Sequence, residues 1–404
     1  EGYAGGIYQG TRWFFNNDDL MKHTADYHLM VNMASVRCDG LESADFADNY
    51  NFYLTDGMTL FQRRGDEYFR IMGGWDVTAS PGVTAREGMD RLVPVTNWRG
   101  YCSRHNFAAG AADGGDYAVG GYIFEKMYGP DKENPDYKGG HPKKNALLYG
   151  FKAYKGYFIL GDYLVALGAG VTNLEPEQEG NIRTTLDQTA RTSPVYLLEK
   201  GRKKPLPMGV TTFDARQLKN AWIVQEGQFA YRALPDYQSD LHVACENRPA
   251  DWARMNEQNR QRKDLPAEVP VLRLWTDHGR TPLADTYGYA VYLGQGEPAR
   301  KLPFEVLRND TLVQAVRSAD RKVIGAVFYP EAPALEAKGL KLEVSAPCAL
   351  VLRETEEDCF VTVADACMDA SLKELALKWN GRDIRIALPQ GMYSGKPVTV
   401  RIDR

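Results

Sequence analysis

Histidine and cysteine are the residue types that most often transfer protons or bind transition metals, and this chain has six of each. His23 and His28 lie five residues apart in a strand-like stretch. Successive side chains of a strand point to opposite faces, so this spacing disfavours two ligands on one face. No cysteine belongs to a C-x-x-C pair. The sequence therefore predicts no metal site.

Common catalytic and cofactor motifs are missing from the sequence. It has no H-E-x-x-H, no G-x-S-x-G and no phosphate-binding P-loop. Gly168-Ala169-Gly170 lacks the third glycine of a dinucleotide fingerprint and follows a predicted hairpin. We therefore expect no bound cofactor.

Aromatic and basic residues indicate a different chemistry. The 23 tyrosines and seven tryptophans could stack on sugar rings, although packing between sheets is the commoner role of such residues. Basic groups such as Arg63-Arg64 and Lys143-Lys144 could meet acidic sugars or form solvated turns. The 49 Lys and Arg against 53 Asp and Glu give a net charge of −4. This balance gives the protein no overall positive electrostatic field that would attract nucleic acid, so no nucleic-acid partner is expected.

The elements that must position these residues are strands. Residues 157–167 have the pattern of two strands joined by a turn at Gly161-Asp162. Residues 222–231 have the same hairpin pattern, with the turn at Glu226-Gly227. Leu375 to Leu388 alternates on both sides of Asn380-Gly381, a strong hairpin signal. The best helix candidate, 252–265, is mostly polar and indicates an excursion between strands. The pattern predicts an all-β protein.

Two interruptions divide the chain. A polar stretch at 128–144 is typical of a long surface loop, and Gly294 to Lys301 separates two β-rich regions. We therefore expect a large β domain over residues 1–300 and a smaller one over 301–404. No run of about 18 apolar residues occurs, so no membrane span is predicted.

Ordered sequence blocks across residues 1–330 resemble polysaccharide lyase family 8, the chondroitin, hyaluronan and xanthan lyases. The blocks are Ser35-Val36-Arg37, residues 52–57, Arg64 to Phe69, Trp75-Asp76, Ser80 to Ala85, Phe107 to Gly114, Lys155 to Phe158, Ala166 to Gly170, Thr184 to Gln188, Asp277-His278-Gly279 and Gln314 to Val316. No single block is decisive, but their order is specific to this family.

The resemblance implies a large antiparallel supersandwich followed by a small C-terminal β-sandwich. It implies cleavage of an acidic polysaccharide, such as chondroitin sulfate or hyaluronan, by β-elimination. An Asn or Arg would neutralise the uronate carboxylate while a Tyr and a His remove the C5 proton. In the family this set lies on an N-terminal helical toroid. We therefore expect that domain to be a partner outside this chain, the chain alone to be inactive, and the protein to be secreted or periplasmic.

The resemblance also places two candidate site residues in this chain. Family members carry a Glu-x-x-Asn loop that orients the catalytic Arg and Tyr, and matching of the flanks puts it on Glu42-Ser43-Ala44-Asp45. Glu42 matches the acidic position. Asp45 replaces the usual Asn, and a carboxylate there repels uronate unless it is protonated or paired. Both residues could also be ordinary polar loop residues.

Two other functions are compatible with this sequence. A non-catalytic carbohydrate-binding protein on a similar scaffold would keep its glycan affinity after Glu42→Ala. A structural β-sandwich module would bind no glycan and would form a concentration-dependent oligomer.

Overall fold

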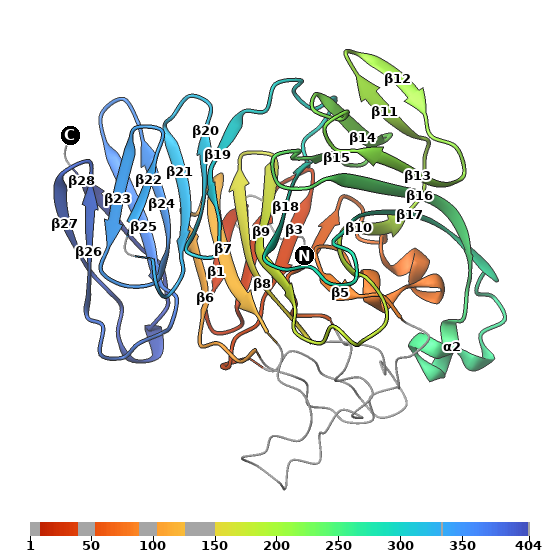
Figure 1. Ribbon diagram of the computed structural model, residues 1–404, viewed down its shortest axis with the longest axis horizontal. Helices are drawn as coiled ribbons and strands as arrows, with labels where there is room; N and C mark the ends of the chain where they lie inside the picture. Colours follow the sequence, from red (N-terminus) through yellow and green to blue (C-terminus); the bar gives the residue numbers. More distant parts are fainter. Residues whose placement is uncertain (1–8, 39–52, 89–102, 126–149, 333, 403–404) are drawn as a thin grey trace, which may run out of the picture.

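The computed structural model describes residues 9–38, 53–88, 103–125, 150–332 and 334–402, and its regular structure is dominated by antiparallel strands. Figure 1 shows the sheets as stacked layers, with the C-terminal strands at one end. Among the described residues no helix is long and apolar enough to cross a membrane. The prediction of an all-β supersandwich followed by a β-sandwich is confirmed.

A nine-stranded sheet forms the central layer, in the order β12-β11-β14-β15-β18-β9-β8-β7-β6. Its strands are β6 (Ala108–Ala112), β7 (Tyr117–Phe124), β8 (Phe151–Leu160), β9 (Tyr163–Asn173), β11 (Val195–Glu199), β12 (Arg202–Pro205), β14 (Ala221–Gln225), β15 (Ala230–Ala233) and β18 (Asp285–Tyr292). Both faces of this sheet are covered. Successive residues of β8 therefore alternate between two apolar cores, with Tyr157 and Ile159 in one and Phe158 and Leu160 in the other.

Two smaller sheets cover one face of the central layer. The first is a four-stranded meander of β1 (Gly10–Phe14), β2 (Asp19–His23), β3 (His28–Asn32) and β4 (Met58–Gln62). The second has the order β13-β16-β17-β10-β5 and consists of β5 (Thr84–Arg86), β10 (Ile182–Ala190), β13 (Gly209–Asp214), β16 (Asp240–Pro249) and β17 (Glu268–Asp277). Their inward side chains and those of the central sheet form the largest apolar core.

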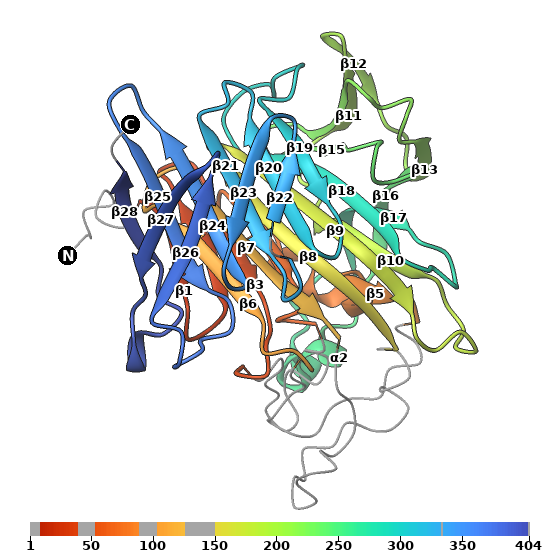
Figure 2. The same cartoon turned by 60° about the vertical axis from the view of Figure 1, so that its left-hand side comes forward.

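A two-sheet sandwich covers the other face. Its six-stranded sheet contains β19 (Phe304–Asn309), β20 (Val313–Ser318), β21 (Val323–Phe328), β24 (Cys348–Glu354), β25 (Cys359–Asp365) and β28 (Val398–Ile402). Its four-stranded sheet contains β22 (Ala334–Ala337), β23 (Leu340–Val344), β26 (Glu374–Trp379) and β27 (Arg382–Ala387). Figure 2 shows these layers beside β6, β7 and β8. The six-stranded sheet packs on the central sheet with one face and on its partner sheet with the other.

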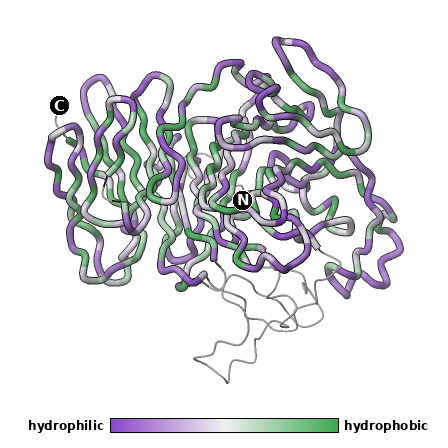
Figure 3. The backbone as a smooth tube through the Cα atoms, in the orientation of Figure 1, coloured by the Kyte–Doolittle hydropathy of each residue, from purple (hydrophilic) through white to green (hydrophobic). Residues whose placement is uncertain are grey.

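The predicted hairpins are confirmed. β8 pairs with β9 around Gly161, whose φ is +56°, and β14 pairs with β15. β26 pairs with β27 around Asn380 and Gly381, both with positive φ, as a type I′ turn requires. The predicted excursion between strands contains α2 (Trp252–Met255) and η6 (Glu257–Gln261). The stretch 128–144 lies outside the described residues. In Figure 3 hydrophilic colour follows many of the turns and β12, the outer strand of the projecting hairpin.

Candidate functional site

The two predicted site residues, Glu42 and Asp45, lie outside the described residues, in the segment 39–52. The structure does describe the chain on both sides of this segment, namely Ser35 to Cys38 and Tyr53 to Gly57. We call these two stretches the anchors of the segment. Their contacts show which parts of the fold hold the chain that carries Glu42.

Arg37 fastens the first anchor to three parts of the protein. Its guanidinium donates to the Asp18 carboxylate at 3.1 Å and to the Asn106 side-chain oxygen at 2.6 Å. It also reaches the carbonyls of Ala108 in β6 and Ala366 in the C-terminal sandwich. Ser35 donates to the other oxygen of Asp18 at 2.6 Å. The Ser35-Val36-Arg37 block is therefore a structural junction between the β1–β2 turn, the central sheet and the C-terminal sandwich.

Lys155 fastens the second anchor. This β8 side chain is fully buried, and its ammonium donates to the Asp56 carbonyl at 3.1 Å and to the Gly82 carbonyl at 2.7 Å. Burial lowers the pKa of Lys155 to about 7, and the nearby Asp56 partly opposes this shift. Lys155 thus ties together three of the sequence blocks, those that contain Asp56-Gly57, Pro81-Gly82 and Lys155 itself.

Glycine is required where these blocks meet. Gly57 and Gly82 have φ values of +78° and +74°. A Cβ on Gly57 would lie 1.9 Å from the Tyr157 hydroxyl oxygen, and one on Gly82 would lie 2.4 Å from the Gly57 carbonyl oxygen. Tyr157 donates to that same carbonyl at 3.2 Å. Close backbone approach therefore explains the glycines of the Asp-Gly and Pro-Gly pairs.

A buried carboxylate links two further blocks. Asp187 in β10 accepts hydrogen bonds from the hydroxyls of Tyr231 at 2.5 Å and Tyr68 at 3.2 Å. Burial raises the pKa of Asp187 to about 7, and the two tyrosine hydrogen bonds oppose that rise. All three side chains lie inside the largest apolar core, so the cluster joins the sheets. We assign it a structural role because no substrate can reach it.

One arrangement has the order of a catalytic relay. His278 contacts the Asp285 carboxylate at 2.7 Å and the Thr184 hydroxyl at 2.9 Å, in the sequence hydroxyl, imidazole, carboxylate. Thr184 is fully buried, however, and its hydroxyl also lies 2.8 Å from that of Thr84. The relay therefore crosslinks β5, β10 and the start of β18 without access for a substrate. Sequence patterns could not reveal it, because its members are distant along the chain.

The residues before β6 also have structural partners. His105 contacts the Glu125 carboxylate at 2.7 Å, and the backbone N–H of Arg104 donates to the Glu125 carbonyl. These contacts give Arg104 and His105 structural roles in the loop before β6. In the described part of the chain no group of three or more His, Cys, Asp or Glu side chains is arranged to hold a metal ion.

Arg37→Ala should lower the free energy of unfolding by about 2–3 kcal/mol, because it leaves the fully buried Asp18 carboxylate with a hydroxyl partner and no cation. Denaturant unfolding followed by circular dichroism measures this loss. Arg385→Ala is the matched control, since Arg385 pairs with Glu374 on the surface and its side chain is 75% exposed. Equal losses in the two variants would contradict the junction role of Arg37.

Comparison with known proteins agrees with the sequence resemblance. Residues 9–301 match polysaccharide lyase family 8, super-sandwich domain, and residues 305–372 match its C-terminal beta-sandwich domain. Chondroitinase-AC of Pedobacter heparinus is 28% identical over 401 residues, which cover 96% of this chain and 51% of that protein. Hyaluronate lyase HylB of Enterococcus faecalis is 21% identical over 337 residues, covering 80% of this chain and 31% of that protein.

Solved structures show the same fold. A chondroitinase AC lyase superimposes with a TM-score of 0.79 at 25% identity and covers 98% of this chain and 54% of its own. A Paenibacillus xanthan lyase gives a TM-score of 0.71 at 17% identity over 91% of this chain and 33% of its own. The chain thus spans about half the length of chondroitinase-AC and about a third of the hyaluronate lyase. By its matched sequence and its sandwich architecture, this chain belongs to polysaccharide lyase family 8.

Proposed function

We propose that this chain is the β-rich part of a lyase that cleaves a uronate-containing polysaccharide, of the chondroitin type, by β-elimination. The family match and the similarity to chondroitinase-AC over 96% of the chain support this proposal. In this proposal the groups that remove the C5 proton belong to a helical domain outside the chain, and the whole protein acts in the periplasm or outside the cell.

The observation that carries the proposal is the anchoring of the segment that contains Glu42. Arg37 fastens one side of this segment to two domains, and Lys155 fastens the other side to the blocks around Gly57 and Gly82. A residue that orients groups on another domain must itself be held on a rigid support. In this proposal Glu42 and Asp45, which lie between the two anchors in the sequence, have positioning roles.

An activity assay tests whether cleavage requires the helical domain in addition to this chain. A longer polypeptide that includes this chain and the preceding helical domain should release unsaturated uronate from chondroitin, measured by its ultraviolet absorbance. The 404-residue chain alone should give no product above background, because within its described residues no exposed Tyr–His pair is placed for proton transfer. Turnover by the chain alone would overturn this assignment. Glycan binding without any product from the longer protein would instead favour a non-catalytic carbohydrate-binding protein.

A further inference from the structure

His23 and His28 lie side by side, contrary to the expectation from their spacing. They belong to different strands of a hairpin, with His23 ending β2 and His28 beginning β3, and they are direct cross-strand partners. The turn between them, Thr24 to Tyr27, reverses the chain, so both side chains point to the outer face of the four-stranded sheet. The spacing argument was wrong because it treated the stretch as one continuous strand.

The register brings the two imidazoles as close as an antiparallel pair allows. The Thr24 N–H donates to the Tyr27 carbonyl at 2.9 Å, so those two residues form a hydrogen-bonded pair. His23 and His28 are then the adjacent non-hydrogen-bonded pair, the type in which side chains are closest. Their ring centroids lie 5.7 Å apart with an interplanar angle of 56°.

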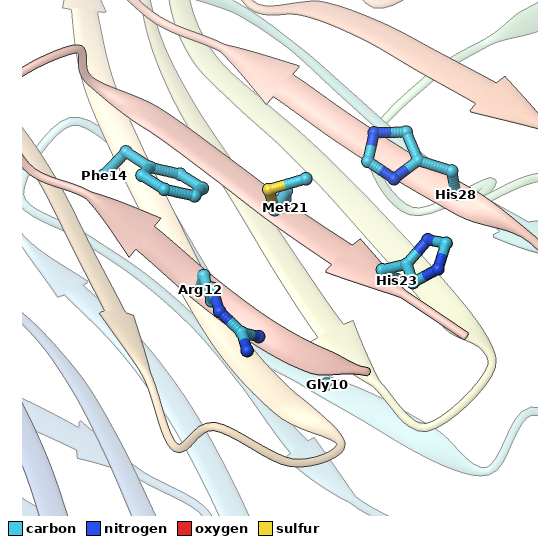
Figure 4. Close-up of a pocket in the computed structure, with 6 residues that line it drawn as sticks. All are labelled: Gly10, Arg12, Phe14, Met21, His23 and His28. Atoms are coloured by element: carbon cyan, nitrogen blue, oxygen red, sulfur yellow. The ribbon is translucent and has the colours of Figure 1, made fainter. Parts of the chain in front are cut away.

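Among the described residues, those that line the space around the two rings include no carboxylate. The rings border a hollow of about 390 Å³ that is also lined by Gly10, Arg12, Phe14 and Met21. Figure 4 shows the two imidazoles at one end of this hollow and Arg12 across from them. Gly10 is the β1 partner of His23, so no side chain fills the position beside that ring.

Charged and polar groups also lie around the two imidazoles. Arg12 on β1 adds a positive charge, while β4 contributes the uncharged Gln62 and the hairpin turn contributes Asp26. Neutral imidazole is the form that binds transition metals.

We propose that His23 and His28 form a two-histidine binding site for a divalent transition ion of the Zn²⁺ or Ni²⁺ class. Two imidazoles bound to one ion at about 2.0–2.1 Å have centroids roughly 4.5–5.5 Å apart, so small rotations of the rings complete the geometry. The described residues supply no third His, Cys, Asp or Glu there, and water occupies the other coordination positions. Imidazole ligands select this class of ion over Ca²⁺ and Mg²⁺.

The site is independent of the proposed lyase chemistry. His28 begins β3, and the anchors follow the other end of this strand at Asn32, four residues and about 13 Å away. An ion at the pair crosslinks β2 and β3 and therefore stabilises the native state by mass action. It should not support or inhibit turnover through the segment that carries Glu42.

The test is titration of the 404-residue chain with Zn²⁺ or Ni²⁺ at pH 7.5, by calorimetry and by thermal unfolding. At an ion concentration ten times the dissociation constant, the folding equilibrium should shift toward the native state by about 11-fold, and a chelator should reverse it. His23→Gln and His28→Gln should each weaken binding at least tenfold.

A matched control separates this site from other histidines. His105→Gln removes an imidazole that contacts Glu125 elsewhere in the fold, and its affinity for the ion should equal that of the unmodified chain. Circular dichroism confirms that each variant is folded. Unchanged binding in both hairpin variants, or equal weakening in His105→Gln, would overturn the proposal. Lyase assays with and without chelator test the proposed function separately, since loss of the ion should leave turnover unchanged.

Discussion

Glu42→Ala in the longer polypeptide should lower kcat for chondroitin cleavage by about 100-fold or more, with a small change in KM. In the proposed site Glu42 orients catalytic groups of the helical domain and does not hold the substrate. Its loss therefore weakens interactions made in the transition state more than those made with the bound polysaccharide. Steady-state kinetics on chondroitin, followed by the absorbance of the unsaturated product, measure both constants.

Two controls distinguish positioning from folding. Glu226→Ala removes an exposed carboxylate in the β14–β15 turn, and it should leave kcat and KM unchanged. The melting temperature of Glu42→Ala should match that of the unmodified protein, whereas a structural role would lower it. Full activity in Glu42→Ala would remove Glu42 from the proposed site.

Substitution of Asp45 gives a second test of the same segment. Asp45→Asn introduces the residue usual in the family and removes a negative charge that repels the uronate. We expect a severalfold lower KM at neutral pH and an unchanged or higher kcat. A higher KM would show that the Asp45 carboxylate is paired with a cation and contributes to binding.

Replacement of Lys155 should have the largest effect on stability. Lys155→Ala leaves the carbonyls of Asp56 and Gly82 without their buried donor and opens a cavity in the core, a loss of about 4 kcal/mol in the free energy of unfolding. Lys155→Met keeps most of the volume and removes the charge. Denaturant titrations at several pH values compare these variants with the unmodified chain.

The pH dependence of stability tests the lowered pKa of Lys155. Burial lowers the pKa of Lys155 to about 7, whereas the unfolded chain keeps the ordinary value near 10.5. Between these values the unfolded state binds more protons, so the free energy of unfolding rises with pH. The slope contributed by this one group approaches about 1.4 kcal/mol per pH unit, and Lys155→Met should remove it.

Lys152 provides the matched control on the same strand. Its ammonium lies 3.5 Å from the Glu125 carboxylate, and its side chain is 28% exposed. Lys152→Met should therefore leave the slope between pH 7 and 9 unchanged. Asp187, whose raised pKa is also about 7, contributes below this window and does not interfere, since its effect lies between pH 3.8 and 7. Identical slopes in Lys155→Met and the unmodified chain would contradict the lowered pKa of Lys155.

Local sequence signals were sufficient to predict the hairpins of this protein. Gly161 and Asn380-Gly381 have the positive φ values that their turns need, and the turn residues alone predict them. The polar stretch after Trp252 likewise indicated an excursion from the sheets. The mainly apolar run from Tyr157 to Leu167 predicted strands, and its burial on both faces explains why few polar residues interrupt it.

Long-range pairing decided what the sequence could not. Arg37 and Lys155 were noted only as members of sequence blocks, and their roles became visible when distant carbonyls were placed beside them. The Thr184–His278–Asp285 relay is another example, since its members come from β10, the residue after β17 and the first residue of β18. Hydrogen bonds between residues that lie about 70 to 330 positions apart leave no periodic signal along the chain.

The sequence by itself determined the strand-rich fold, the turn positions and, through its ordered blocks, the family. These properties depend on neighbouring residues, whose preferences act over a few positions. Only the tertiary structure decided which polar residues are buried crosslinks and which face solvent, and it placed His23 beside His28. The physical reason is that burial and cross-strand register depend on how whole sheets stack, and no short stretch of sequence records that.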